Sequence, residues 1–147
     1  MTCKEAYLRF SSYGAYAKDV ALFLARLTLA YGFYTPAMNK WSDIDAVAAW
    51  FGNSLGIPFP TLNAYMAATT ELLGVILLTL GLFTRLISIP LMVVMVVAIT
   101  TVHLGNGFSA GDNGFEIPLY YFLFLLMFVA NGGGKYSLDR VIFGKES

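Results

Sequence analysis

Five ionisable side chains lie within or beside long apolar stretches of the sequence, where a charge is costly and usually has a task. They are Arg26, Lys40, Glu71, His103 and Glu116. A histidine, two carboxylates and two cations suit proton transfer to a carbonyl group whose oxygen develops negative charge. A quinone head group is one such ligand, because its carbonyl oxygens need donors and protons when it is reduced. These residue types therefore predict a polar site inside a membrane.

Aromatic side chains follow Glu116 closely and could line an apolar slot for a quinone tail. The other interpretation is that this aromatic stripe faces lipid or packs in the protein core. The candidate catalytic residues are Arg26, Glu71, His103 and Glu116, and the candidate substrate-binding residues are Lys40 and Tyr120.

Each charged residue taken alone also has a structural interpretation. A buried arginine–glutamate pair could simply lock two helices together. His103 and Glu116 could stabilise helix ends, and Lys40 could extend its ammonium group to the membrane surface. His103, Glu71 and Glu116 are possible metal ligands, but the neighbouring cations disfavour a metal ion, so we predict none.

The composition places these residues in an integral membrane protein. The chain has 147 residues, of which 58% are hydrophobic and 12% are charged. Soluble domains carry about 25% charged residues, so about half of the usual surface charge is missing. Nine basic residues balance nine acidic ones without any basic stripe, which argues against a nucleic-acid partner. The single cysteine, Cys3, excludes an internal disulfide, and no haem, flavin or cluster motif occurs.

Four apolar stretches approach the roughly 20 residues that a membrane-spanning helix needs. We predict an all-α, four-helix transmembrane bundle that forms a single domain over residues 1–147, with spans at about 20–38, 62–82, 86–104 and 115–130. Ser42 to Asp45 has the spacing of a capping box and predicts a short helix at about 43–52, lying on the membrane interface. Aromatic residues and lysines in the N-terminal tail predict a second interfacial segment.

The basic residues outside these spans predict the orientation of the chain. Those on one side are Lys4, Arg9, Lys18, Arg85, Lys135, Arg140 and Lys145, whereas the two opposite loops hold only Lys40. Both termini are therefore expected in the cytoplasm.

A rise of about 1.5 Å per residue gives the depth of the charged groups. Arg26 and Glu71 approach the middle of the membrane from opposite sides, and we expect them to pair about 8 Å apart along the normal, within reach of their side chains. His103, Glu116 and Lys40 fall near the outer edge. This predicts one polar cavity open to the outside, with the Arg26–Glu71 pair at its floor.

Several motifs resemble the DoxX family of small four-helix bacterial membrane proteins. They are Arg26 with LTLAYGFY and Lys40, LGIPFP at 55–60, ATTELLGVILLTLGLFTR at 68–85, IPLMVVMVVAITTVH at 89–103, NGFEIPLYY at 113–121 and GKYSLDR at 134–140. The resemblance implies the bacterial inner membrane and a link to quinone-dependent oxidoreductases, oxidative-stress complexes or biosynthetic clusters for metal-binding peptides. It also implies that the arginine, glutamate, histidine and second glutamate of the family fall on Arg26, Glu71, His103 and Glu116.

The first functional hypothesis is therefore a membrane redox subunit that acts on a quinone, supplied with electrons by a soluble or membrane partner protein. The second is a non-enzymatic accessory protein that assembles or stabilises another complex. A third is a transporter for a small anion, which four spans without a repeat would support only in a homo-oligomer.

Overall fold

The computed structural model describes residues 1–144, which are helical and contain no strand. Lys145, one of the basic residues used above for orientation, lies outside the described residues. The α-helices are α1 (Cys3–Ser12), α2 (Gly14–Ser42), α3 (Ile44–Asn53), α4 (Pro60–Leu80), α5 (Thr84–Ala98), α6 (Glu116–Asn131) and α7 (Leu138–Phe143). A π-helix, Ile99–His103, and a 3-10 turn, Leu104–Asn106, extend α5.

Three helical segments of the described chain are long and apolar enough to cross a membrane: Cys3–Ser42, Pro60–Leu80 and Thr84–Asn106. The fourth apolar helix, α6, has 16 residues and is shorter than that. The predicted all-helical membrane fold is thus confirmed in its coarse form. The first helix is longer than the predicted 20–38, because α2 runs from Gly14 to Ser42 and α1 precedes it almost without a break.

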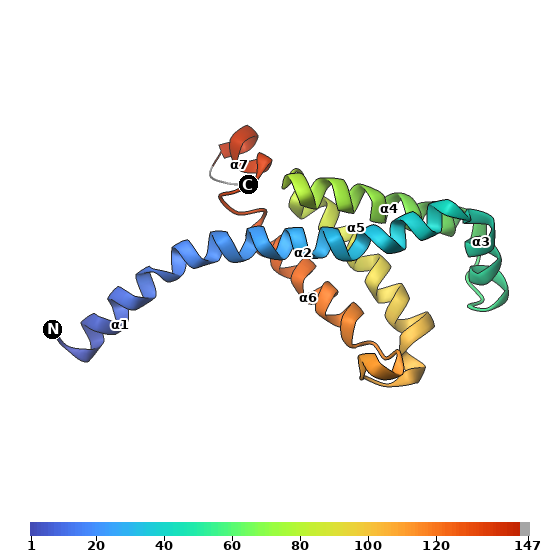
Figure 1. The fold of residues 1–147 in the computed structure, drawn as a ribbon, viewed down its shortest axis with the longest axis horizontal. Helices are drawn as coiled ribbons and strands as arrows, with labels where there is room; N and C mark the ends of the chain where they lie inside the picture. Colours follow the sequence, from blue (N-terminus) through green and yellow to red (C-terminus); the bar gives the residue numbers. More distant parts are fainter. Residues whose placement is uncertain (145–147) are drawn as a thin grey trace.

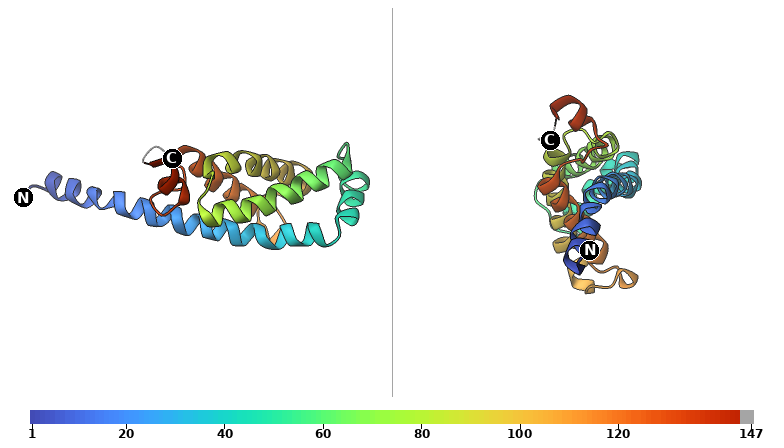
Figure 2. Two further views of the ribbon diagram at one scale, coloured as in Figure 1. Left: turned by 90° about the horizontal axis from the view of Figure 1, so that it is seen from above. Right: turned by 90° about the vertical axis from the view of Figure 1, so that its left-hand side faces the viewer.

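The long helices pack as two pairs, α2 with α4 and α5 with α6, and α4 joins the pairs through its contact with α5. The pairs meet at the end of the bundle where α7 lies and diverge toward the end where α3 lies (Figure 1). We call these the α7 end and the α3 end. Figure 2 shows the same bundle from two further sides, with α1 extending away from it.

Small residues allow the helices to approach closely, as is common in membrane proteins. A Cβ atom on Gly74 of α4 would lie 2.8 Å from Leu91 Cδ1 of α5, so a larger residue there would require the Leu91 side chain to move. Gly32 of α2 is in a similar position against the phenol of Tyr121 on α6, whose ring also packs edge-on against Phe33 at 5.3 Å. The largest buried core side chains include Leu22, Leu29, Phe33, Leu78, Leu91, Leu125 and Phe128.

The short helix predicted at about 43–52 is observed as α3, and its place at the membrane interface stays a prediction. Its cap differs from the expectation. Asp43 Oδ1 accepts from Ala46 N at 3.0 Å, whereas the Ser42 hydroxyl donates to Asn39 O at the end of α2. The prediction of a cap at Ser42 is wrong because α2 continues through Ser42.

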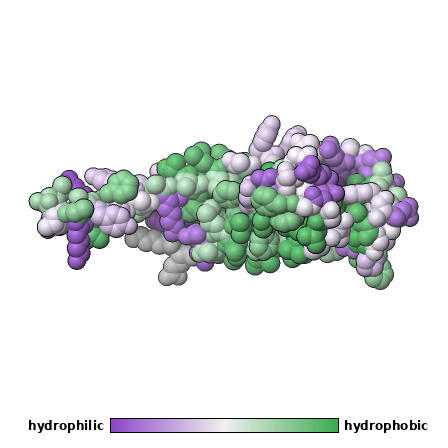
Figure 3. All heavy atoms as spheres, turned by 90° about the horizontal axis from the view of Figure 1, so that it is seen from below, coloured by the Kyte–Doolittle hydropathy of each residue, from purple (hydrophilic) through white to green (hydrophobic). Residues whose placement is uncertain are grey.

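Apolar side chains face outward along the bundle. On the face shown in Figure 3, hydrophobic residues cover the middle of the molecule, and hydrophilic residues gather toward its two ends. Leu86, Val93 and Leu62 are exposed by 66%, 59% and 59%. Such large exposed apolar surface is foreign to soluble monomers and suits contact with lipid.

Candidate functional site

Arg26 is fully buried on α2 and binds three backbone carbonyl groups. Its Nε donates to Gly133 O at 3.0 Å and its Nη1 to Leu78 O at 2.8 Å, and its Nη2 donates to Tyr136 O. The planar guanidinium group, with donors pointing in several fixed directions, suits such a set of acceptors. Arg26 therefore ties α2 to the end of α4 and to the segment that follows α6.

The contact of Arg26 with α4 satisfies a helix terminus. The last carbonyls of an α-helix have no partner within it, and a cation is favourable there. Leu78 lies in the last turn of α4, which ends at Gly81 with a left-handed φ of 67°. A side chain on Gly81 would collide with the guanidinium group. Glycine therefore permits the left-handed conformation at the helix end and also leaves room for the Arg26 side chain.

The predicted ion pair between Arg26 and Glu71 is not formed. Arg26 lies level with Leu78 of α4, and Glu71 is seven residues earlier on that helix, about 10 Å along its axis. The expected offset along the axis is close to the observed one, but Arg26 finds carbonyl acceptors at its own level and Glu71 finds Lys40.

Asp139, just after the start of α7, completes this end of the bundle. Its Oδ1 accepts from Phe83 N at 2.7 Å and its Oδ2 from Thr84 N at 3.0 Å, while its own N–H donates to Gly81 O at 3.0 Å. The carboxylate thereby caps the N-terminus of α5, where a negative charge is favourable. We call Arg26, Gly81, Thr84, Gly133 and Asp139 the α7-end cluster.

Glu71 instead pairs with Lys40 of α2. Lys40 Nζ lies 3.1 Å from Oε1 and 2.9 Å from Oε2 of Glu71, and this is the one ion pair within residues 1–144. The side chains are exposed by only 20% and 3%. Next to the pair, Trp41 Nε1 donates to Ala68 O at 3.1 Å. The interpretation of Lys40 as a side chain reaching for the membrane surface is wrong, because its ammonium group binds an acid on the neighbouring helix.

His103 ends the π-helix and faces the loop before α6. Its Nδ1 lies 2.9 Å from Asn113 O, and Asn106 Nδ2 donates to the same oxygen at 3.1 Å. A carbonyl oxygen only accepts, so Nδ1 carries the proton. Nε2 makes no hydrogen bond to any residue of the described chain, and in the neutral ring it keeps its lone pair.

Glu116, the first residue of α6, also holds this loop. Its Oε2 accepts from Ala110 N at 2.8 Å, and its Oε1 accepts from the Tyr120 hydroxyl at 3.0 Å. His103 and Glu116 thus both form hydrogen bonds with backbone groups of the 107–115 segment. We call His103, Asn106, Asn113, Glu116 and Tyr120 the loop cluster.

The charged groups lie in three places rather than in one cavity. These are the α7-end cluster, the Lys40–Glu71 pair and the loop cluster. Two hollows of the described surface lie elsewhere, one on the N-terminal helices and one in an apolar groove between α5 and α6. The charged groups expected to share one cavity instead have separate partners, because Arg26, His103 and Glu116 bind backbone groups at helix ends and loops, and Glu71 binds Lys40. No three His, Cys, Asp or Glu side chains within residues 1–144 are grouped to hold a metal ion.

Several site residues were missed by reasoning from the sequence. Asp139 stood in the GKYSLDR motif, but nothing local indicates that it caps a helix that begins 55 residues earlier. Trp41, whose indole N–H donates to Ala68 O of α4, was not among the candidate site residues. One feature of the sequence could have indicated the contact of Tyr121 with Gly32. A glycine in an apolar helix often marks a place where two helices approach closely.

Together, the fold and its buried charges define a small, all-helical membrane protein. The DoxX family model matches residues 21–104, and the chain belongs to the DoxX family. An uncharacterized protein of Haemophilus influenzae is 32% identical over 130 residues, which cover 84% of this chain and 83% of that protein. A Bacillus subtilis protein named "Putative oxidoreductase CatD" is 28% identical, covering 88% of this chain and 92% of its own length. The inner membrane protein YphA of Escherichia coli is 34% identical over 82 residues, 56% of this chain and 57% of its own. No solved structure matches.

Proposed function

We propose that the protein is a subunit of a quinone-linked oxidoreductase in the bacterial inner membrane. The observation that carries the proposal is the Lys40–Glu71 pair, held between two apolar helices with Glu71 only 3% exposed. Charged residues inside a membrane commonly mark proton relays and ligand sites. The name of the Bacillus subtilis relative, which describes an oxidoreductase, supports the same class of activity.

In the proposed arrangement α2, α4, α5 and α6 cross the membrane and the α7 end faces the cytoplasm. Basic residues favour the cytoplasmic side, and Lys18, Arg85, Lys135 and Arg140 belong to that end. Lys40, the one basic residue toward the opposite end, is bound to Glu71. With this orientation α3 would lie at the outer interface.

Reduction of a quinone to a quinol takes up two electrons and two protons. Lys40 would turn from Glu71 to donate a hydrogen bond to a quinone carbonyl, and the released Glu71 carboxylate would take up a proton from water and pass it to the same oxygen. His103 and the Tyr120–Glu116 pair are further groups that would exchange protons with the proposed site. Since the chain has no haem, flavin or cluster motif, the electrons would come from a soluble or membrane redox partner. Arg26, bound to three carbonyls, would position α2 rather than touch the substrate.

Mass spectrometry of small molecules extracted from mildly purified protein tests this proposal. The wild type should carry quinone enriched over bulk lipid, and Glu71→Gln should lose it while inserting normally. Asp112→Asn, at an exposed acid in the 107–115 loop, is the matched control and should keep the quinone. Equal, bulk-lipid levels in the wild type and in Glu71→Gln would reject the proposal.

A second candidate function is that of a non-enzymatic accessory protein. It is favoured by the structural contacts of Arg26, Asp139 and Glu116, each of which binds backbone groups. This function predicts a stoichiometric protein partner in affinity purifications and no enriched quinone. Transport of a small anion receives no support from Arg26, because its guanidinium group is bound to three carbonyl oxygens.

A further inference from the structure

The N-terminal helix α1 makes no buried contact with the rest of the protein. None of its residues, Cys3–Ser12, is buried, and it extends away from the bundle beyond the α7 end (Figures 1 and 2). Phe10 is exposed by 75% and Tyr7 by 69%. A free helix with such large exposed aromatic side chains needs a partner surface.

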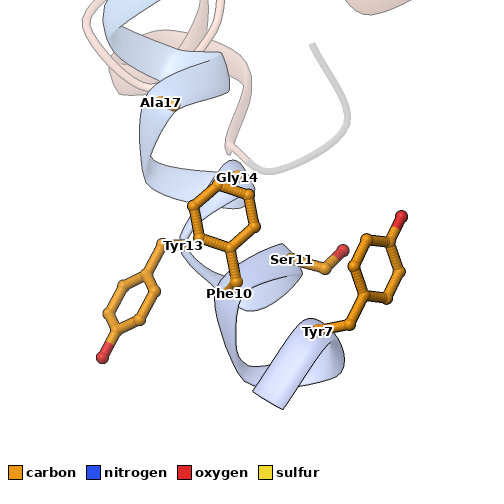
Figure 4. A pocket seen from close by; sticks show the side chains of 6 residues that line it. All are labelled: Tyr7, Phe10, Ser11, Tyr13, Gly14 and Ala17. Carbon is orange, nitrogen blue, oxygen red and sulfur yellow. The ribbon is translucent and has the colours of Figure 1, made fainter. Parts of the chain in front are cut away.

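One face of this helix is apolar and continues onto the start of α2. The residues Cys3, Tyr7, Phe10, Gly14 and Ala17 recur every three or four positions, so they lie along one stripe. Most of them line a shallow surface hollow of about 340 Å³. Figure 4 shows Phe10 beside Gly14, with the Tyr7 and Tyr13 rings to either side. No atom lies within 4 Å of where a Cβ on Gly14 would be, so this face is open.

The charge of this segment is positive. Lys4 and Arg9 lie on the flanks of the apolar stripe, and Lys18 follows on the first turns of α2. The acid Glu5 is held in a capping box, where it accepts from Thr2 N at 2.8 Å. The other nearby acid, Asp19, accepts from Lys135 N at 3.0 Å. The segment therefore presents basic side chains to an acidic partner.

A membrane around the apolar helices would present its headgroup region beside α1. α1 ends at Ser12 and α2 begins at Gly14, so only Tyr13 lies between α1 and a helix that becomes apolar from about Val20, and a bend at Tyr13 would bring α1 toward the membrane surface. An amphipathic helix with aromatic residues on one face and flanking lysines and arginines is typical of segments that lie in the lipid headgroup region. Basic residues next to a span attract anionic lipids.

We propose that α1 is a lipid-binding helix. Its Cys3–Tyr7–Phe10 face enters the headgroup region, and Lys4, Arg9 and Lys18 bind the phosphate groups of anionic phospholipids. This proposal is independent of the redox function, because it needs only a membrane beside α1.

Cys3 allows a direct test, since it is the single cysteine, is exposed and lies on the apolar stripe. The full-length protein is labelled at Cys3 with a small environment-sensitive fluorophore and placed, one copy per disc, in lipid nanodiscs. One set of discs contains phosphatidylcholine alone and the other contains 30% phosphatidylglycerol, a fraction chosen as about that of an anionic membrane. Emission wavelength and quenching by aqueous iodide report the burial of the label.

We expect a shorter emission wavelength and weaker quenching in the anionic discs than in the zwitterionic ones. Each basic residue near an anionic surface contributes about 1 kcal/mol, or roughly fivefold. The variant Lys4→Gln/Arg9→Gln should therefore lower the ratio of bound to free α1 roughly 25-fold in anionic discs at low salt. Phe10→Ser should expose the label in both lipids. Leu8→Ser, on the opposite face of the same helix, is the control and should behave as wild type.

Two results would overturn the proposal. One is a label that is quenched equally in anionic discs, zwitterionic discs and detergent. The other is protection that appears only when two copies share a disc, which would identify the partner of α1 as a second copy of the chain.

Discussion

The buried charges of this protein differ in what they bind. Arg26 is surrounded by carbonyl oxygens of three different segments, whereas Glu71 binds the ammonium group of Lys40. The first arrangement joins backbone segments and the second is an ion pair between two helices. These two residues, which the sequence suggested as partners, therefore have separate tasks.

Replacing Arg26 by lysine should destabilise the protein. A lysine ammonium group cannot reach three carbonyls that surround a planar fork, and hydrogen bonds to a charged group contribute about 1.5–3 kcal/mol each. We expect the free energy of unfolding in detergent to fall by roughly 3 kcal/mol or more. Arg85→Lys, at an exposed arginine, is the control. If Arg26→Lys unfolds at the same temperature as wild type, the assigned role of Arg26 is wrong.

The Lys40–Glu71 pair should show strong coupling in a double-mutant cycle. Removing one partner of a buried ion pair commonly costs about 3–5 kcal/mol, while replacing both with apolar side chains is often close to neutral. Glu71→Met should therefore destabilise the protein more than Lys40→Met/Glu71→Met does. The measurement is thermal unfolding of the purified variants. If the loss of stability in Lys40→Met/Glu71→Met equals the sum of the losses in Lys40→Met and Glu71→Met, these side chains do not interact.

At the scale of elements, the ends of the helices explain most of the polar contacts. α5 begins after Phe83, which has no side-chain acceptor to cap it, and Asp139 supplies the missing oxygens. At the other end of α5, the π-helix turns His103 toward the loop that Glu116 closes. Hydropathy along the sequence does not predict these contacts, because they join segments far apart in the chain.

Asp139→Asn should loosen the start of α5. Loss of an N-cap carboxylate costs about 0.5–2 kcal/mol, and the amide group of asparagine would turn one donor toward the backbone N–H groups. We expect faster hydrogen exchange at the amides of Phe83 and Thr84, whose acceptor is Asp139. Asp112→Asn, at an exposed acid, should leave this exchange unchanged. Unaltered exchange in Asp139→Asn would contradict the capping role.

For the whole molecule, hydropathy located α4, the extended α5 and α6 to within about two residues, because apolar helices depend on local composition, whereas α2 extends beyond its predicted bounds at both ends. The family was also recognised from its motifs, and the match over residues 21–104 confirms it. What could not be predicted was the partner of each charged group. Arg26 binds carbonyl groups near the end of α4 and after α6 rather than Glu71, and these acceptors come from segments far apart in the chain.

The two helix pairs are joined firmly at the α7 end and diverge toward the α3 end (Figure 1). The α7-end cluster fixes the junction, while Lys40 and Glu71 lie on the α2–α4 pair and the loop cluster lies on the α5–α6 pair. This arrangement distinguishes the proposed quinone site from the apolar groove lined by Met92, Val96 and Phe122, on the surface of the α5–α6 pair.

Photoaffinity labelling with an azido-quinone, followed by peptide mapping, tests the central claim most directly. The proposal predicts cross-links on the α2 peptide around Lys40 and the α4 peptide around Glu71, competed by unlabelled quinone and lost in Glu71→Gln. Cross-links confined to the groove between α5 and α6, or equal to those of an azido-lipid without a quinone head group, would contradict it.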